Sequence, residues 1–439
     1  MKGKCLFNYT NAMEKTIGND GVLSTDIEHI KNEIEESYNR LFKKYENKEL
    51  GFMDLIYQKD LTTYNELKKY SKDFEYIIII GMGGSILGAQ MVYEAIKGIY
   101  YNEHTTNKKV YFLDNSDPEK TFEVLNLVDL EKTLVFAISK SGNTAETIAN
   151  FLIVRDRLKN NIKNYVKNIV IVANDGMLRE MAEKEGYMLF DVPKNVGGRF
   201  SVLSAVGLAP LSCMGINIEM LLNGARDMDK LCKNKDIFKN PALMNAVIHY
   251  ILYNKGKTVA VLMPYIERLH KFGMWYRQLW GESLGKDGKG QTPVVSVGAK
   301  DQHSQLQLYL EGPKDKIITF LRVNKFKNDL IIKNSNYLSG HNLSELLLSE
   351  QEGTEASLTS RNVPNVSIVI DELNEYTLGK LIYLYEMQTA FMGELLKINA
   401  FNQPAVEDGK RITRELLRGK SIEELTGFKS YDKNYIIEM

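Results

Sequence analysis

The sequence predicts an α/β protein made of two doubly wound domains, in which helices cover both faces of a mostly parallel sheet. Short apolar and β-branched runs alternate with helical patterns along the chain, which is the mark of this class. The clearest run, at residues 76–80, contains four successive isoleucines, as expected of a strand covered on both faces. The alternation pauses at residues 211–240 and then starts again, which indicates a second layer of the same kind.

The predicted elements follow in order along the chain. Strands are expected at residues 76–80, 110–114, 133–138, 169–173 and 187–192, and in the second layer at 258–264, 293–298, 317–323 and 366–371. Helices are expected at 217–231, 241–253 and 376–398, and Pro404 is expected to begin another. The predicted organisation is a helical N-terminal segment (1–70), two α/β domains (71–225 and 226–400) and a C-terminal helical segment (401–439).

Composition narrows the class of protein. The chain has 439 residues, with 56 Lys and Arg against 56 Asp and Glu, so its net charge is zero. This balance argues against binding to nucleic acid or to a membrane surface through bulk charge. The three cysteines have no metal-binding spacing and fit reduced thiols, and no signal peptide or membrane span is apparent. We therefore expect a soluble, cytoplasmic protein.

An anion site is suggested where the predicted strand 133–138 ends. Ser139, Lys140, Ser141 and Thr144 follow the strand directly, and a helical pattern begins after them. The first N–H groups of a helix have no partner within the helix and attract anions. The alternative is an ordinary helix cap, in which Asn143 and Glu146 form a capping box without any ligand.

A glycine-rich loop, GMGGSILG, follows the strand at residues 76–80. A dinucleotide-binding fingerprint would need a glycine at Ile86, and no P-loop lysine follows, so neither nucleotide motif is complete. The remaining Gly-Gly-Ser turn presents Gly84 and Ser85. It either faces the same anion as Ser139 or serves only to pack the strand against its helix.

Further candidates for catalysis are spread over the chain. Arg199, in the segment GGRFS, is suited to stabilising an oxyanion, although a lone arginine is more often a surface ion-pair partner. Gln278 and Glu282 are four residues apart in a helical pattern and so share a face, with Glu282 either a general base or a solvated helix-end glutamate. No two of the six histidines, His303 among them, have the spacing typical of a metal site.

The last motif, FNQPAVEDGK, contains Gln403 before a predicted helix and Lys410 two turns along it. Gln403 is placed to cap that helix, and a lysine such as Lys410 is ordinarily a solvated charge. Alone, neither residue indicates a function.

In order and spacing these segments resemble one family. GMGGSILG, SKSGNTAET, GGRFS, QLWGES with GQTP, DQHSQ and NQPAVEDGK are similar to the motifs of the phosphoglucose isomerase family, closest to its shorter bacterial branch. The resemblance runs from about residue 70 to about residue 415. It implies two sugar-isomerase-type doubly wound domains (three-layer α/β/α) with a helical N-terminal lead-in and C-terminal helices.

The resemblance also implies roles for the candidate residues. Glu282 would be the base that moves a proton between C2 and C1, Arg199 would stabilise the enediolate, and His303 and Lys410 would assist ring opening. Binding of the sugar phosphate would fall to Gly84, Ser85, Ser139, Lys140, Ser141, Thr144, Gln278 and Gln403. In that family the histidine comes from the neighbouring subunit, so a homodimer is expected. One departure is Asn402 before Gln403, where the family often has aspartate.

The resemblance implies reversible conversion of glucose 6-phosphate to fructose 6-phosphate through a cis-enediol, as in glycolysis and gluconeogenesis. No cofactor or metal is expected, because abstraction of a proton beside a carbonyl needs only a base and a group that stabilises the oxyanion. Three alternatives stay open: a bifunctional enzyme that also accepts mannose 6-phosphate, a non-catalytic sugar-phosphate sensor and, least favoured, an NAD-dependent dehydrogenase.

Overall fold

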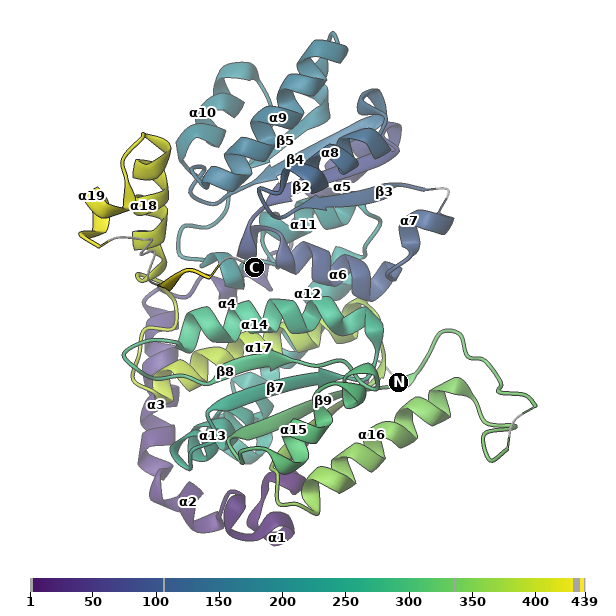
Figure 1. Cartoon of the computed structure of the whole chain (residues 1–439), viewed down its shortest axis with the longest axis vertical. Coiled ribbons are helices and arrows are strands. Elements are labelled where there is room, and N and C mark those ends of the chain that lie inside the picture. The colour runs from purple at the N-terminus through teal and green to yellow at the C-terminus, as the bar shows by residue number, and fades with distance from the viewer. Residues whose placement is uncertain (1–2, 106, 335, 429–434, 438) are drawn as a thin grey trace. The chain divides into compact units, whose positions relative to one another are not determined.

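The computed structural model describes residues 3–105, 107–334, 336–428, 435–437 and 439. Residues Met1–Ala400 form one compact unit, and Phe401–Met439 form a second. Both sheets lie in the first unit (Figure 1). The division of this unit near residues 70 and 225 stays a prediction.

The first sheet contains five parallel strands in the order β3-β2-β4-β5-β6. Their bounds are β2 Tyr76–Gly81, β3 Lys109–Leu113, β4 Thr133–Ile138, β5 Ile169–Val172 and β6 Met188–Phe190. The chain adds β3 on one side of β2 and then continues on the other side with β4. The loops after β2 and β4 therefore meet at the point where the winding reverses, which is where doubly wound sheets bind ligands.

The second sheet repeats this winding in the order β8-β7-β9-β10-β1. Its parallel strands are β7 Val259–Pro264, β8 Thr292–Val295, β9 Lys316–Lys325 and β10 Asn365–Glu372. The edge strand β1, Cys5–Asn8, pairs with β10 in antiparallel register, with Leu6 opposite Val369. Sequence reasoning missed β1, because four residues in a region expected to be helical carry too little pattern to predict a strand.

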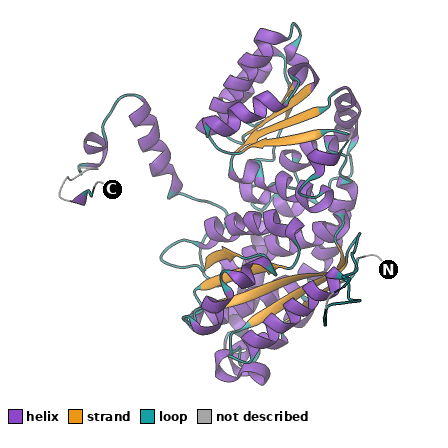
Figure 2. Ribbon diagram, turned by 45° about the vertical axis from the view of Figure 1, so that its right-hand side comes forward, coloured by secondary structure: helices purple, strands orange, loops and turns teal. Residues whose placement is uncertain are grey.

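Helices cover both faces of the first sheet (Figure 2). On one face, Ile78, Val135 and Ile171 join a core with residues from α8 Pro118–Leu127, α9 Ala145–Asn161 and α10 Gly176–Glu185. Across the sheet lie α6 Leu87–Lys97 and α11 Ala205–Cys213, which pack against each other. Residues Ile77, Ile78, Ile79 and Ile80 are each 0% exposed, as a strand covered on both faces requires.

A long buried helix, α17 Glu375–Leu395, organises the second half of the unit. It packs against α3 Lys31–Glu46, α12 Ile218–Cys232, α13 Pro241–Asn254 and α14 His270–Leu284. One face of the second sheet is covered by α15 Leu306–Glu311 and α16 Leu343–Thr359. These helices contribute Tyr309 and Leu358 to the core on that face. Two doubly wound α/β layers are thus present, and the predicted fold class is confirmed.

The remaining helices are short. They are α1 Glu14–Ile17, α2 Ser24–His29, α4 Phe52–Leu55, α5 Thr62–Tyr70, α7 Tyr101–His104, α18 Val406–Leu417 and α19 Ile422–Thr426. The helix expected to open at Pro404 begins at Val406 instead, with Ala405 as its N-cap and no side-chain cap. The prediction that Gln403 caps this helix is therefore wrong.

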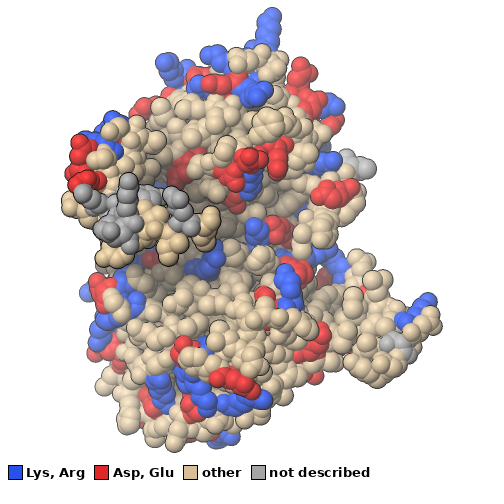
Figure 3. Space-filling view, viewed as in Figure 1, with Lys and Arg blue, Asp and Glu red and all other residues tan. Residues whose placement is uncertain are grey.

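The surface carries charges of both signs. On the face shown in Figure 3, Lys and Arg are interspersed with Asp and Glu and form no continuous stripe of one sign. Among the described helices, none combines the length and the apolar character that a membrane crossing requires.

Candidate active site

The loop between β4 and α9 is shaped to leave the helix start open. Gly142 has a φ of +64°, and a Cβ there would lie 1.7 Å from the carbonyl oxygen of Asp175, so only glycine fits. The helix begins at Ala145, and Thr144 occupies the N-cap position without a side-chain capping bond. The Asn143 side chain instead accepts a hydrogen bond from the N–H of Met177 at 3.1 Å. The capping-box alternative is therefore wrong, and within the described part of the chain no side chain is found to cap the N–H groups of the first turn.

Two hydroxyls lie together at this helix start. The Oγ of buried Ser139 and the Oγ1 of Thr144 are 2.9 Å apart, while the backbone N–H of Ser139 is held by the carbonyl of Val172 at 3.0 Å. Ser141 is exposed, and its Oγ accepts from the N–H of Asn143 at 3.4 Å. The side chains of the predicted anion site thus come from one loop, while the binding of an anion there stays a prediction.

Lys140 is more constrained than its sequence suggests. Its ammonium donates to the carbonyls of Lys194 and Val196, each at 2.7 Å, and burial lowers the pKa of this lysine. These two bonds connect the loop after β4 to the segment that leads into Arg199. The ammonium also places a positive charge near the predicted anion site.

The Gly-Gly-Ser turn, η4 Gly83–Ser85, brings three elements into close contact. A Cβ on Gly84 would lie 2.2 Å from the backbone carbon of Gly198, and one on Gly83 would lie 2.6 Å from the Nε2 of Gln278. These glycines therefore have a packing role, and the half-buried Ser85 lies in a turn that contacts η7 Gly198–Phe200, which contains Arg199. Whether the turn also faces an anion stays a prediction.

Arg199 is a buried arginine held from several directions. It lies in η7, Gly198–Phe200, and is 3% exposed. Its Nε donates to the Oγ of Ser283 at 2.6 Å, its Nη2 donates to the carbonyl of Ala400 at 2.6 Å, and its Nη1 lies 3.4 Å from an Oε2 of Glu282. The alternative of a surface ion pair is wrong.

Glu282 occupies the last turn of α14 and faces this arginine. Its other carboxylate oxygen accepts from the Nε2 of Gln278 at 3.1 Å, so the two residues share a face as predicted. The Glu282 side chain is 36% exposed, against 2% for that of Arg199. A partly accessible carboxylate beside a buried guanidinium is suited to moving a proton next to a carbonyl group, because the guanidinium stabilises the resulting oxyanion.

In the part of the chain that the structure describes, no hydrogen bond or ion pair joins His303 to Arg199 or Glu282. It ends η10, Lys300–His303, and is exposed, whereas its neighbours are anchored: Asp301 accepts from the N–H of Val297 at 2.6 Å and Gln302 donates to Tyr265 at 2.6 Å. Among the described residues, no hydrogen bond or ion pair of the His303 side chain is found. The loop is thus fixed while its histidine points outward.

Gln403 and Lys410 belong to the second unit. Lys410 is exposed on α18 and pairs with Glu407 at 2.7 Å. Gln403 is exposed in the segment before that helix. The roles of both residues stay predictions. For a metal, the described residues provide no cluster of three or more His, Cys, Asp or Glu side chains.

Sequence reasoning missed two residues at this site, Ser283 and Lys286. Ser283 is the acceptor for Arg199, and the Lys286 ammonium donates to the carbonyls of Glu282 and Ser283 at 2.8 and 2.7 Å. Their closeness to Glu282 in the sequence, one residue for Ser283 and four for Lys286, was the available signal, but neither residue type points to this role without the backbone geometry.

Comparison with known proteins agrees with this fold. The model of the family described as phosphoglucose isomerase matches residues 63–435. A probable glucose-6-phosphate isomerase of Methanococcus maripaludis is 54% identical over 96% of this chain and 97% of its own length. The glucose-6-phosphate isomerase of Methanocaldococcus jannaschii is 46% identical over 94% of this chain and 99% of its own. The solved glucose-6-phosphate isomerase of Chlamydia trachomatis superposes with a TM-score of 0.74 at 25% identity, covering 85% of this chain and 79% of its own.

The fold and the site thus define a member of the sugar-isomerase class of α/β proteins. Within that class, the chain belongs to the phosphoglucose isomerase family, and the resemblance seen in the motifs is confirmed.

Proposed function

We propose that this protein interconverts glucose 6-phosphate and fructose 6-phosphate through ring opening and a cis-enediol intermediate. The single observation that carries the proposal is the pairing of Glu282 with buried Arg199 at 3.4 Å, in a chain of the phosphoglucose isomerase family. The relatives named above as glucose-6-phosphate isomerases match almost the whole chain, which supports the same activity here.

The proton transfer needs only these two side chains. Glu282 removes the proton on C2 of open-chain glucose 6-phosphate, a double bond forms between C1 and C2, and the electron pair of the C1 carbonyl becomes an oxyanion. Arg199 stabilises that oxyanion, since a buried guanidinium is little screened by water. The proton of the C2 hydroxyl then moves to the oxygen on C1, so that the negative charge lies on the oxygen on C2. Glu282 returns its proton to C1 while that charge forms the C2 carbonyl, which gives fructose 6-phosphate with atoms and charge balanced.

The phosphate is assigned to the loop after β4. Ser139, Ser141 and Thr144 provide hydroxyls and the start of α9 provides N–H groups. Following the resemblance to the family, Gly84 and Ser85 are proposed to bind the phosphate as well. Lys140 acts mainly through its charge, because two of its three ammonium N–H groups already donate to backbone carbonyls. Gln278 contacts Glu282 and is proposed to touch the sugar as well, as is Gln403.

Ring opening is assigned to His303 and Lys410, following the resemblance to the family. We propose a homodimer in which His303 of one subunit completes the site of the other. The exposure of His303 on an anchored loop supports this arrangement. We also propose a cytoplasmic location, which fits three unpaired cysteines.

A coupled assay tests the proposal. Purified protein is mixed with fructose 6-phosphate, and the glucose 6-phosphate formed is measured with an excess of a dehydrogenase specific for it. We expect turnover without added metal, unchanged by a chelator. No turnover, or turnover abolished by the chelator alone, would contradict the proposal. A parallel reaction with mannose 6-phosphate as substrate reports whether the enzyme is bifunctional.

A further inference from the structure

We propose that Lys286 is a positioning residue for this site. Its ammonium holds the last turn of α14 in the geometry in which Glu282 and Ser283 both meet Arg199. The inference rests on the proposed isomerase function and assigns Lys286 no contact with the substrate.

The four carbonyl groups at the end of α14 all have hydrogen-bond partners. The last four carbonyls of a helix have no partner within it, and such ends fray unless something binds them. The carbonyl of Gly281 accepts from the N–H of Gly285 at 3.0 Å, and that of Leu284 accepts from the N–H of Lys286 at 2.9 Å. The carbonyls of Glu282 and Ser283 accept from the Lys286 ammonium at 2.8 and 2.7 Å. One lysine thus satisfies three of the four carbonyls that the helix leaves open.

The last turn of α14 carries two side chains that contact Arg199. Glu282 and Ser283 are consecutive, yet both side chains reach the same guanidinium, at 3.4 Å and 2.6 Å. This convergence depends on the backbone of two adjacent residues, whose carbonyls are the ones that Lys286 binds. If the turn loosens, the carboxylate and the hydroxyl lose their alignment with Arg199 together.

The positive charge of Lys286 strengthens its hydrogen bonds to this turn. A cation at a helix C-terminus is favoured by the helix dipole. Lys286 is half-buried, and burial, followed by the positive charge of Arg199, lowers the pKa of Lys286 to about 8, while Glu282 and Asp287 oppose the shift. The ammonium therefore loses its charge gradually as the pH rises through about 8, and charge-assisted hydrogen bonds are about twice as strong as neutral ones.

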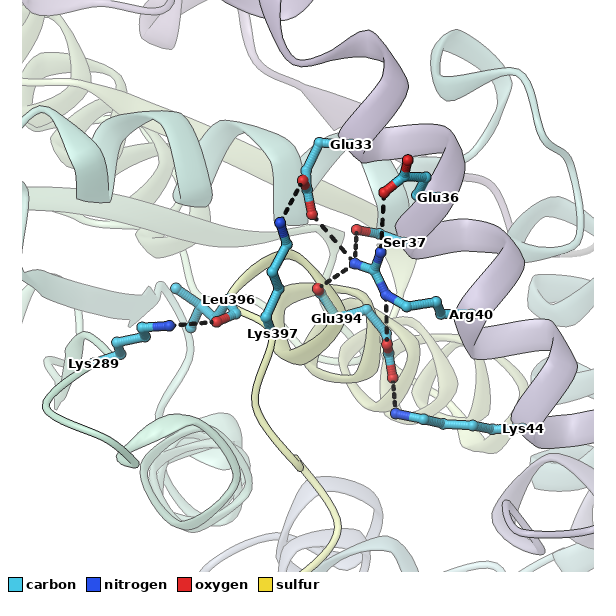
Figure 4. Close-up of polar contacts among 9 residues, drawn as sticks. All are labelled: Glu33, Glu36, Ser37, Arg40, Lys44, Lys289, Glu394, Leu396 and Lys397. Atoms are coloured by element: carbon cyan, nitrogen blue, oxygen red, sulfur yellow. Dashed lines mark hydrogen bonds and ion pairs between the residues drawn. The ribbon is translucent and has the colours of Figure 1, made fainter.

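Kinetics of three variants test the inference. Lys286→Met removes the ammonium, Lys286→Arg keeps a cation at alkaline pH, and Lys289→Met is the matched control. Lys289 lies on the same loop and also binds the end of a helix, donating to the carbonyl of Leu396 at 2.9 Å beyond α17 (Figure 4). For each protein, kcat and KM for fructose 6-phosphate are measured from pH 6.5 to 9.5, together with the melting temperature.

The wild-type kcat is expected to fall above about pH 8. In Lys286→Met, kcat at neutral pH should drop about tenfold with little change in KM, and the alkaline fall should disappear, since an interaction of the transition state is lost. In Lys286→Arg most activity should remain and the fall should move to higher pH, because arginine stays charged. Lys289→Met should match the wild type.

Two results would overturn the inference. One is an unchanged kcat in Lys286→Met; the other is an alkaline fall that stays in place in Lys286→Arg, a readout that survives even if Lys286→Met does not fold. An inactive wild type would count against the proposed function instead, so the two failures are distinguishable.

Discussion

Arg199 and Ser283 are joined by a hydrogen bond of 2.6 Å between Nε and Oγ, and both residues are buried, at 3% and 0% exposure. This bond connects the segment after the first sheet with the last turn of α14, which carries Glu282. Together with the bond from Nη2 to the carbonyl of Ala400, it sets the plane of the guanidinium, so that Nη1 faces the Glu282 carboxylate.

Replacing Ser283 with alanine removes the acceptor of a buried, charged donor. We expect kcat to fall about tenfold with little change in KM, because a hydrogen bond to a charged group contributes about 1.5–3 kcal/mol and here orients a group needed in the transition state. Steady-state kinetics measure the effect. Ser212→Ala is the control, since Ser212 is also buried and its hydroxyl donates to the carbonyl of Ala209 at 2.7 Å and lies 3.9 Å from the Sγ of Cys213, neither of which belongs to this site. Equal kinetics for the two variants would show that Ser283 does not orient Arg199.

Glu282→Gln keeps the shape of the side chain and removes the base. We expect kcat to fall by about 100-fold or more with little change in KM, since general base catalysis typically contributes about 10²–10⁴. The coupled assay with fructose 6-phosphate measures it. An unchanged kcat would remove Glu282 from the role of base.

Thr144→Val removes one of the two hydroxyls at the start of α9 without changing the size of the side chain. We expect KM to rise about fivefold while kcat changes little, because the phosphate is bound alike in the ground state and the transition state. Thr389→Val, in which the lost hydroxyl donates only to the carbonyl of Tyr385 at 2.7 Å, is the matched control. A loss in kcat alone would place Thr144 at the reacting carbons rather than at the phosphate.

Mixing subunits tests whether the site is shared. If His303 acts in the neighbouring subunit, the single variants His303→Ala and Glu282→Gln are each nearly inactive, but a mixed dimer has one site with both groups intact. Exchange of differently tagged chains, followed by purification through both tags, gives that dimer, and about half of the wild-type activity is expected. Absence of activity in a verified mixed dimer would show that both groups act within one subunit.

Stability depends on a cluster of charges around Arg40 that joins α3 to the end of α17 (Figure 4). Arg40 donates to the carbonyl of Glu394 at 2.8 Å and pairs with its carboxylate at 3.4 Å, and Lys44 binds the same carboxylate. The Glu394 side chain is 5% exposed, so loss of a partner leaves a charge poorly compensated.

We expect Arg40→Met to lower the free energy of unfolding by about 1–3 kcal/mol, measured by urea denaturation. Lys31→Met, on the same helix, is the control, because its pair with Glu28 is exposed on both sides, at 69% and 74%. A similar effect for both variants would mean that the buried carboxylate of Glu394 does not depend on Arg40.

Features of this chain that depend on neighbouring residues are predictable from the sequence, whereas those that depend on tertiary contacts are not. The strands were predictable because each run is short, apolar and followed by a helical pattern; Ile77–Ile80 carries that signal in four residues. The capping role given to Asn143 failed because a tertiary contact, with the N–H of Met177, competes for the same side-chain oxygen. The start of α18 was placed two residues early because proline marks a helix start only approximately.

By itself the sequence determined the fold class, the family and the identity of the candidate base, cation and phosphate loop, because these depend on residue type and on spacing along the chain. Only the tertiary structure decided that Arg199 is buried, that Ser283 and the carbonyl of Ala400 hold it, and that Lys286 binds the turn beneath Glu282. Arg199 lies 83 residues from Glu282 and 201 from Ala400 in the chain. Contacts over such separations follow from how the two layers pack, and no local pattern encodes them.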